Sequence, residues 1–159
     1  MTTILFDPIE RALYADGRIT NENMIRTNSA KKIETINIPK LGKCLITYAG
    51  VGTEILHCKK YLMGLVGKSE SENEANCLFI DKSGIAYIYY SGDDTYNKLE
   101  DQNICYTDGS GYQFAIGAYK ASGSGFDAIE AAKQCDVYSG GITTKAYFYK
   151  GLPVFEVTK

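Results

Sequence analysis

Short runs rich in Ile, Val, Thr, Tyr and Phe dominate the chain, and most are bounded by Gly, Asn, Asp or Ser. β-branched and aromatic residues between such boundaries are typical of β-strands. The pattern predicts strands at residues 3–6, 12–15, 32–38, 44–49, 77–81, 85–90, 112–116 and 143–149. The triplet Lys82-Ser83-Gly84 predicts a tight turn, so residues 77–90 should form a hairpin. Residues 150–153 predict another hairpin near the C-terminal end.

Only two stretches have the periodicity of a helix. Residues 53–66 place apolar side chains three and four positions apart, with Lys59 as an interruption. The members of this stripe are Ile55, Leu56, Leu62, Met63 and Val66. Thr53 is the predicted N-cap and Gly67 the predicted stop. A second helix is predicted for residues 126–138, ahead of two glycines, with an apolar face formed by Phe126, Ile129, Ala132 and Val137.

Many strands and few helices predict an α+β fold built in layers. The chain has 159 residues, about the size of one ordinary domain with one hydrophobic core. No repeat and no linker divides it, so we expect a single domain over residues 1–159. The charged and polar residues 68–76 predict a solvated loop.

Composition and charge narrow the class of protein. Hydrophobic residues make up 45% and charged residues 23%, close to the globular average, so the chain should fold. The net charge is −2 with both signs interleaved, which predicts no binding to nucleic acid or to an anionic membrane. No apolar run approaches the roughly 20 residues that span a bilayer, and the first residues lack the features of a secretory signal. We therefore expect a cytoplasmic protein.

The cysteines and the single histidine offer little chemistry. Five cysteines without a CxxC pair predict reduced structural thiols. They are Cys44, Cys58, Cys77, Cys105 and Cys135. No cysteine pair has ligand spacing and His57 is the only histidine, so we predict no metal site and no cofactor. A Ser-His or Cys-His arrangement would need His57, which lies inside the first helical pattern, where a partly buried structural role is expected.

Thr2 is the first candidate for catalysis. A small residue behind Met1 commonly becomes the first residue of the mature chain, and a free N-terminal threonine combines a hydroxyl nucleophile with its own base. An α-amino group has a pKa of roughly 7.7–8.0, so it accepts a proton near neutral pH. Many chains begin with Met-Thr, so Thr2 gains meaning only from the segments that follow it.

Four such segments occur in a particular order. They are Tyr14-Ala15-Asp16-Gly17-Arg18-Ile19-Thr20, Ala30-Lys31-Lys32-Ile33, Tyr48-Ala49-Gly50 and Asp136-Val137-Tyr138-Ser139-Gly140-Gly141. Together with Thr2-Thr3 they resemble the proteasome β-subunit family and its bacterial relative, the HslV peptidase. Both are N-terminal nucleophile hydrolases, and the resemblance covers most of the chain. Singly, each segment is equally typical of a turn, a solvated face or a helix stop.

The resemblance implies a fold and a role for each matching residue. The fold would be the family's four-layer αββα sandwich of two antiparallel sheets, with reduced helical layers because this chain is short. Thr2 would be the nucleophile and Lys32 would lie beside its hydroxyl, lowering the hydroxyl pKa. The other roles fall to Asp16 as the partner of the lysine, Gly50 as the oxyanion donor, and Asp136 with Ser139 as the pair that orients the amino group and the threonine hydroxyl.

Three features depart from the family pattern. The family has a serine in a Gly-Ser-Gly motif ahead of its third helix, and the match at residues 114–118 puts Ala118 there, with Ser122 or Ser124 as substitutes. Only one helix of each family pair is predicted, which removes part of the ring contacts. If Met1 is retained, the nitrogen of Thr2 is an amide and cannot act as a base.

The resemblance predicts a threonine-type endopeptidase that cleaves peptides or unfolded proteins. It also implies a homo-oligomer and an ATPase partner. The alternative is a catalytically inactive module that keeps the fold for assembly or for binding another protein. A third hypothesis is an amidohydrolase that acts on a small amide.

Overall fold

The computed structural model describes residues 2–159, which form an α+β fold with three helices and antiparallel sheets of five, five and two strands. The α+β prediction is therefore confirmed. One large sheet has the order β10-β1-β2-β11-β12, with β1 (Thr3–Asp7), β2 (Ala12–Asp16), β10 (Tyr106–Gly109), β11 (Thr143–Tyr149) and β12 (Leu152–Thr158). The other has the order β5-β6-β7-β8-β9, with β5 (Ile33–Ile38), β6 (Gly42–Gly50), β7 (Ala75–Ile80), β8 (Ala86–Tyr90) and β9 (Asn97–Lys98).

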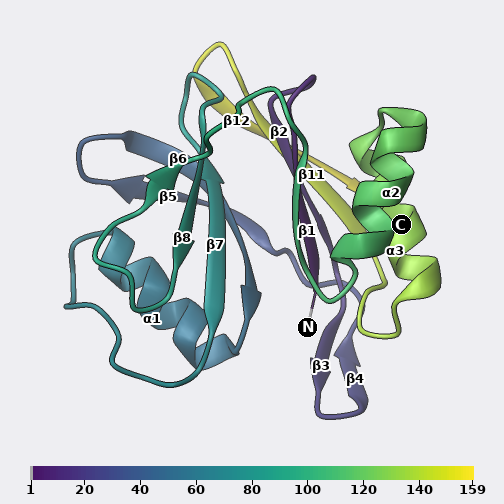
Figure 1. Cartoon of the computed structure of the whole chain (residues 1–159), viewed down its shortest axis with the longest axis horizontal. Helices are drawn as coiled ribbons and strands as arrows, with labels where there is room; N and C mark the ends of the chain where they lie inside the picture. The colour runs from purple at the N-terminus through teal and green to yellow at the C-terminus, as the bar shows by residue number, and fades with distance from the viewer. Residues whose placement is uncertain (1) are drawn as a thin grey trace.

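The helices cover the outer faces of these two sheets (Figure 1). Helix α1 (Gly52–Leu62) packs on the β5–β9 sheet, whereas α2 (Tyr112–Ser122) and α3 (Gly125–Cys135) pack on the sheet that contains β1. The two sheets face each other across a shared hydrophobic core. The layers therefore follow one another as helix, sheet, sheet and helix pair.

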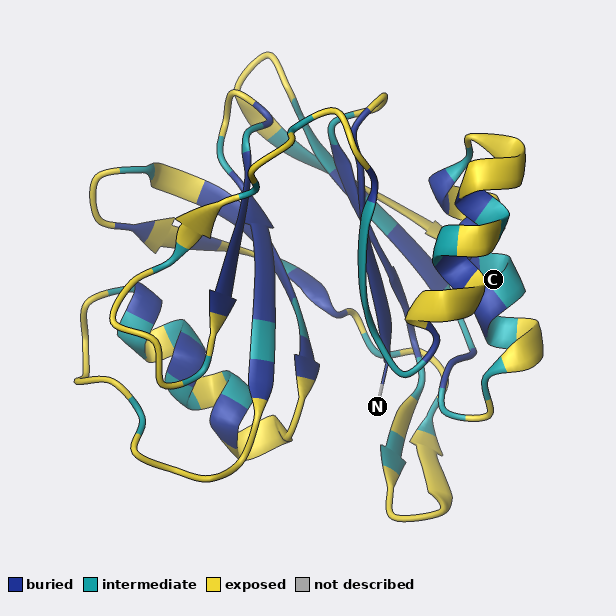
Figure 2. Ribbon diagram, viewed as in Figure 1, coloured by how far each residue is buried: buried dark blue, intermediate teal, exposed yellow. Residues whose placement is uncertain are grey.

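Strand β1 shows why this layering follows from the sequence. All five of its residues are buried, because the strand has a sheet on one side and helices on the other. Ile4 and Phe6 join the core between the sheets, while Leu5 joins the core against α2 and α3. Alternate residues of a strand point to opposite faces, so a run of apolar residues is needed to fill both cores. Figure 2 shows this buried interior and the exposed outer surfaces.

Most of the predicted strands are confirmed. The hairpin at residues 77–90 is formed by β7 and β8, with Ile80 opposite Ala86. The C-terminal hairpin is formed by β11 and β12, with Tyr149 opposite Leu152. The predicted loop after α1 is exposed over residues 70–74, and β7 already begins at Ala75. None of the helices within residues 2–159 is long and apolar enough to cross a bilayer.

The strand predicted at residues 112–116 is wrong, because these residues begin helix α2. Tyr112, Phe114 and Ile116 alternate as they would in a strand, but Tyr112 and Phe114 are largely exposed. The residues that α2 buries are Ala115 and Tyr119, four positions apart, and they pack in the same core as Leu5 of β1. The structure therefore has two helices, α2 and α3, where the sequence predicts only one.

Two details of the other helices also differ from the prediction. Val51, and not Thr53, is the N-cap of α1, and this helix ends at Leu62 before it reaches the predicted stop. Helix α3 ends at Cys135, and Val137 beyond it is 73% exposed, so it does not belong to the apolar face. The buried face of α3 is formed instead by Gly125, Ala128, Ile129 and Ala132.

Strands β3 (Ile19–Asn21) and β4 (Met24–Thr27) form a separate hairpin that projects from the body of the molecule (Figure 1). Its apolar side chains Ile19, Met24 and Ile25 are all exposed. The hairpin follows β2 directly, so its first strand lies beside the end of β2 that carries Asp16.

Candidate active site

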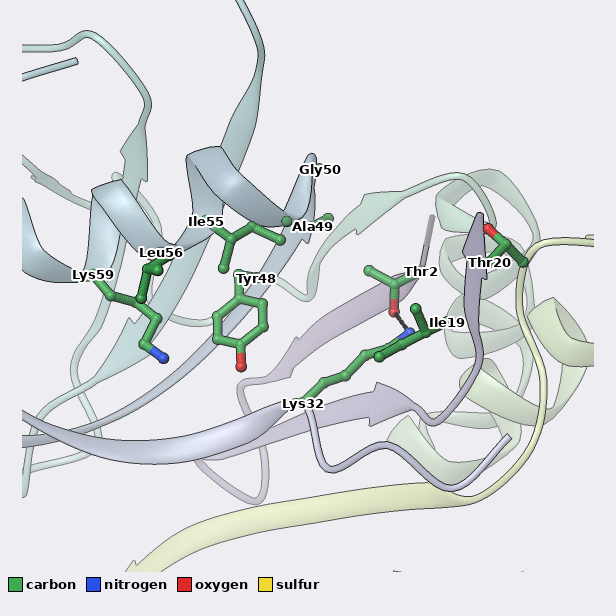
Figure 3. A pocket seen from close by; sticks show the side chains of 11 residues that line it. Thr2, Ile19, Thr20, Lys32, Tyr48, Ala49, Gly50, Ile55, Leu56 and Lys59 are labelled. Atoms are coloured by element: carbon green, nitrogen blue, oxygen red, sulfur yellow. Dashed lines mark hydrogen bonds between the residues drawn. The ribbon is translucent and has the colours of Figure 1, made fainter. Parts of the chain in front are cut away.

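Thr2 lies immediately before β1, and its side chain is almost completely buried. The Lys32 ammonium donates a hydrogen bond to Thr2 Oγ1 at 2.5 Å, and the threonine hydroxyl donates in turn to Asp16 Oδ1. Figure 3 shows the Thr2 and Lys32 side chains pointing toward each other. The structure thus brings together three of the residues that the sequence singled out.

Asp16 is held at the end of β2 by an unusually complete set of donors. The backbone N–H groups of Thr3, Arg18 and Gly140 donate to its carboxylate at 3.0, 3.2 and 2.8 Å. The Lys32 ammonium donates to Oδ1 at 3.0 Å. The Asp16 side chain is 0% exposed, so these contacts replace the water that a carboxylate would otherwise bind.

Lys32 stands just before β5 and reaches across to Thr2 and Asp16. Its ammonium also donates to the carbonyl of Arg18, so three acceptors surround it. Burial lowers the pKa of Lys32, and the nearby Arg18 acts in the same direction, while Asp16 opposes the shift. Lys32 therefore gives up a proton more readily than a lysine in water, and its ammonium lies within proton-transfer reach of the Thr2 hydroxyl.

Gly50 ends strand β6 on the opposite side of the cleft from Lys32 (Figure 3). It stands opposite Ala75 of β7, and the N–H of the next residue, Val51, donates to the Glu74 carbonyl. In an antiparallel ladder this makes Gly50 and Ala75 a non-hydrogen-bonded pair, so the N–H of Gly50 points away from β7. Strand β5, on that side, pairs with β6 only as far as Thr47. The Gly50 N–H is therefore directed toward the cleft.

The backbone explains why glycine is needed at position 50. Its φ is +128°, a conformation that residues with a Cβ rarely adopt. A Cβ at Gly50 would also come within 2.7 Å of the Cα of Ala75. A side chain at this position would therefore strike strand β7.

Asp136 and Ser139, the last predicted pair, lie in the segment between α3 and β11. The hydroxyl oxygens of Ser139 and Thr3 are 2.6 Å apart, and Ser139 donates to Asp136 Oδ2 at 2.6 Å. Burial alone would raise the pKa of Asp136, but hydrogen bonds from Ser110 and Ser139 outweigh it and lower the pKa. The pair thus contacts Thr3 and Ser110, whereas the Thr2 hydroxyl contacts Asp16 and Lys32.

Ser110 is a site residue that the sequence reasoning missed. Its backbone N–H donates to the Thr2 carbonyl at 2.8 Å, and its hydroxyl donates to Asp136 Oδ2 at 2.5 Å. Gly109, its neighbour, has a φ of +94°, and a Cβ there would lie 2.8 Å from the carbonyl carbon of Thr2. Glycine therefore lets the chain approach Thr2 closely.

The signal for Ser110 was present in the sequence as the triplet Gly109-Ser110-Gly111, directly ahead of α2. The match of this motif to residues 114–118 was wrong, because those residues lie inside α2. The substitutes offered for Ala118 were also wrong. Ser124 caps the start of α3 by accepting from the Asp127 N–H, and Ser122 ends α2, so both lie at the far end of this 11-residue helix from Ser110. That length is about 16 Å.

Thr2 is the meeting point of two recesses. The larger, of about 420 Å³, is lined by residues of β3, β6 and α1 and by Lys32, which precedes β5 (Figure 3). Its side-chain lining includes Ile19, Lys32, Tyr48, Ile55, Leu56 and Lys59. The smaller, of about 220 Å³, is lined by Glu74, Asn76, Asp108 and Ser110 among others. Thr2, Ala49 and Gly50 line both recesses, so a ligand that spans them must pass the Thr2 hydroxyl and the Gly50 backbone.

Three further predictions concern Met1, a metal site and His57. Met1, whose removal the threonine mechanism requires, lies outside the described residues. Within residues 2–159, no group of three or more His, Cys, Asp or Glu side chains is placed to hold a metal ion. His57 is half-buried on α1, and its ring bonds to the Gly67 carbonyl at 2.8 Å.

Comparison with known proteins does not assign this chain to a family. No protein-family model and no curated protein sequence matches it. Any functional assignment therefore rests on the geometry around Thr2.

Proposed function

We propose that this protein is a threonine-type peptidase of the N-terminal nucleophile class, similar to the proteasome β-subunit and HslV. The observation that carries the proposal is the 2.5 Å contact between the Lys32 ammonium and Thr2 Oγ1, at the junction of two recesses. A lysine, a carboxylate and a threonine hydroxyl in mutual contact form an activated nucleophile rather than an ordinary surface ion pair. The layering of helix, sheet, sheet and helix pair supports the family's four-layer αββα fold.

The proposed reaction begins with attack by Thr2 Oγ1 on the carbonyl carbon of a peptide bond. The hydroxyl proton passes to the free amine of Thr2, and the ammonium of Lys32 stabilises the negative charge left on the oxygen. The departing amine takes the proton as the C–N bond breaks, which leaves an ester on Thr2. Water then adds to this ester, and its hydrolysis releases the acyl half of the peptide and restores the threonine.

The Gly50 N–H is the proposed donor to the oxyanion of the tetrahedral intermediate. Its direction toward the cleft follows from the β6–β7 pairing and does not depend on a side chain that could rotate. One such preorganised donor contributes on the order of 3 kcal/mol to a transition state. The Ser110 N–H holds the Thr2 carbonyl, and the Ser110 side chain is itself held by Asp136, so Thr2 is fixed at its carbonyl as well as at its hydroxyl.

The free amine of Thr2 is the condition on which the proposal depends. We expect intact-mass measurement and N-terminal sequencing to find a chain that begins at Thr2. In such a preparation, Thr2→Ala should abolish cleavage of fluorogenic peptides, because the nucleophile is lost. Thr2→Ser keeps a hydroxyl at the same position and should retain measurable activity. Undiminished activity in Thr2→Ala would refute the peptidase assignment.

The second candidate function is a non-catalytic module that binds another protein or a further copy of itself. The exposed apolar residues of the projecting β3–β4 hairpin favour this role. A chain that retains Met1 and is inert toward a threonine-directed electrophile would support the second function. A chain that begins at Thr2 and is labelled at that residue would support the first.

A further inference from the structure

The two recesses beside Thr2 differ in the charge of their linings. Lys32 and Lys59 line the larger recess, and no acidic residue does. The smaller recess is lined by the carboxylates of Glu74 and Asp108, and by no lysine or arginine. None of the ion pairs formed within residues 2–159 involves either carboxylate.

Asp108 is oriented by neutral donors, and no ion pair within residues 2–159 offsets its charge. Asn76 Nδ2 donates to Oδ2 at 2.8 Å, and the Tyr106 hydroxyl donates to the same oxygen at 3.3 Å. The Gly109 N–H donates to Oδ1 at 2.6 Å. These donors fix the carboxylate at the wall of the recess, next to Ser110. Glu74 is exposed at the rim, directly before Ala75 of β7.

The contacts of Ser110 indicate which half of a substrate enters the smaller recess. The Ser110 hydroxyl donates to Asp136, which also accepts from Ser139, and Ser139 contacts the Thr3 hydroxyl. These hydroxyl groups and the carboxylate form a chain of exchangeable protons. Its member Ser110 lines the smaller recess, and none of its members lines the larger one. In the proposed reaction the departing amine takes its proton from the Thr2 amine, and the departing half belongs on the side where these polar groups can assist that transfer. The acyl half then occupies the larger recess.

We propose that the smaller recess selects substrates with a lysine or arginine directly after the scissile bond. This inference rests on the proposed peptidase function. A cationic side chain in that position would meet the carboxylates of Asp108 and Glu74, whereas a glutamate would be repelled by them. Both carboxylates are accessible to water, so the attraction is moderate and should weaken with salt.

The test uses internally quenched peptides that differ only in the residue after the scissile bond, which is Lys, Gln or Glu. With the chain that begins at Thr2, we expect kcat/KM to be about tenfold higher for the Lys peptide than for the Gln peptide, and lowest for the Glu peptide. Raising the salt from about 0.05 M to about 0.5 M should shrink the Lys-to-Gln ratio several-fold.

Variants assign the preference to the recess. Glu74→Gln and Asp108→Asn should each reduce the Lys-to-Gln ratio by about threefold. Glu72→Gln is the matched control, because Glu72 is exposed in the same loop but does not line the recess, and its ratio should stay unchanged. Glu74 is also exposed and makes no fold-stabilising ion pair within residues 2–159, so its variant gives a result even if Asp108→Asn disturbs β10.

The outcomes separate this inference from the function it rests on. Equal cleavage of the three peptides, or a preference that Glu74→Gln, Asp108→Asn and salt leave untouched, would overturn the inference and leave the peptidase intact. No cleavage of any peptide by a chain with a free Thr2 amine would overturn both.

Discussion

Thr2 is held on two sides by polar groups that differ in burial and charge. On one side, Asp16 and Lys32 form an ion pair whose side chains are 0% and 7% exposed. On the other side, Ser110 and Asp136 are only half-buried, and hydroxyl groups rather than a cation satisfy the carboxylate. The Thr2 hydroxyl thus contacts a dry charged pair, whereas the Thr2 carbonyl is held by a half-buried serine that is linked to a half-buried carboxylate.

The difference in burial predicts a difference in how each side tolerates change. A charge in a dry site stays costly when its partner is removed, because water cannot replace the lost contact. A hydroxyl in a half-buried site can be replaced by water at a small cost. We therefore expect the charged pair to govern both folding and reactivity, and the hydroxyl chain to govern reactivity alone.

Lys32→Met should have the largest effect. It removes the cation beside Thr2 and leaves the Asp16 carboxylate buried, so we expect kcat to fall at least about a thousandfold. Three backbone N–H groups still donate to Asp16, which limits the loss in the free energy of unfolding to about 2–4 kcal/mol. Thermal unfolding should then show a Tm lower by about 5–15 °C.

Lys145→Met is the control for this variant. Lys145 lies on β11, forms ion pairs with Glu10 and Glu156, and lines neither recess beside Thr2. Its loss should cost no more than about 1 kcal/mol and leave peptide cleavage unchanged. Normal turnover in Lys32→Met would contradict the role of the ammonium, whatever happens to the Tm.

Ser110→Ala probes the other side and should have an intermediate effect. The backbone N–H of residue 110 still donates to the Thr2 carbonyl, and Asp136 keeps its contacts with Ser139 and Tyr138. Unfolding should therefore change by less than about 1 kcal/mol. We expect kcat/KM to fall about 10- to 100-fold, because the chain of exchangeable protons is interrupted.

The matched control is Ser122→Ala at the far end of α2. Ser122 is exposed, and its hydroxyl accepts a local hydrogen bond from the Ser124 N–H. This variant should cleave peptides at the normal rate. Equal losses in both variants would mean that Ser110 acts through helix α2 and not through Asp136.

The side of Thr2 that carries Asp16 and Lys32 could be predicted from the sequence. The side that carries Ser110 and Asp136 could be predicted only in part. Asp16 and Lys32 were found because the motifs that contain them follow Thr2 in order, and the β1–β2 pairing brings Ala15 opposite Ile4. Strands that follow one another directly in the chain usually pair with each other, so few other arrangements of β1 and β2 are possible. The layered α+β class could be predicted for a similar reason, since the strand runs are apolar and regularly bounded.

The sequence pattern does not point to Ser110, because the alternation of residues 112–116 predicts a strand where helix α2 begins. Tyr112, Phe114 and Ile116 alternate as strand residues do, and only the packing of Ala115 and Tyr119 in the core with β1 decides for a helix. Because a strand is predicted there, the sequence does not predict that a helix begins directly after the Gly109-Ser110-Gly111 triplet. Tertiary contacts override local pattern in such short apolar runs.

The pH dependence of the cleavage rate should show the smallest effect, but one that is specific to Lys32 and not to Ser110. The rate should rise as the Thr2 amine loses its proton, at roughly pH 7.7–8.0. It should fall again when Lys32 loses its proton, because the neutral amine no longer stabilises a charged oxygen. Burial lowers the pKa of Lys32 from its ordinary 10.5, so this alkaline limb should begin at a lower pH than an exposed lysine would give.

The same shift affects stability with a definite sign. Between the lowered pKa of folded Lys32 and the ordinary value in the unfolded chain, the unfolded state binds more protons, so this group makes the free energy of unfolding rise with pH. Ser110→Ala should lower the rate at every pH and keep the alkaline limb where it is. Lys32→Met should lose both the limb and the rise in stability. A limb that moves in Ser110→Ala would show that the two sides titrate as one unit, because the pKa of Lys32 would then depend on the hydroxyl chain.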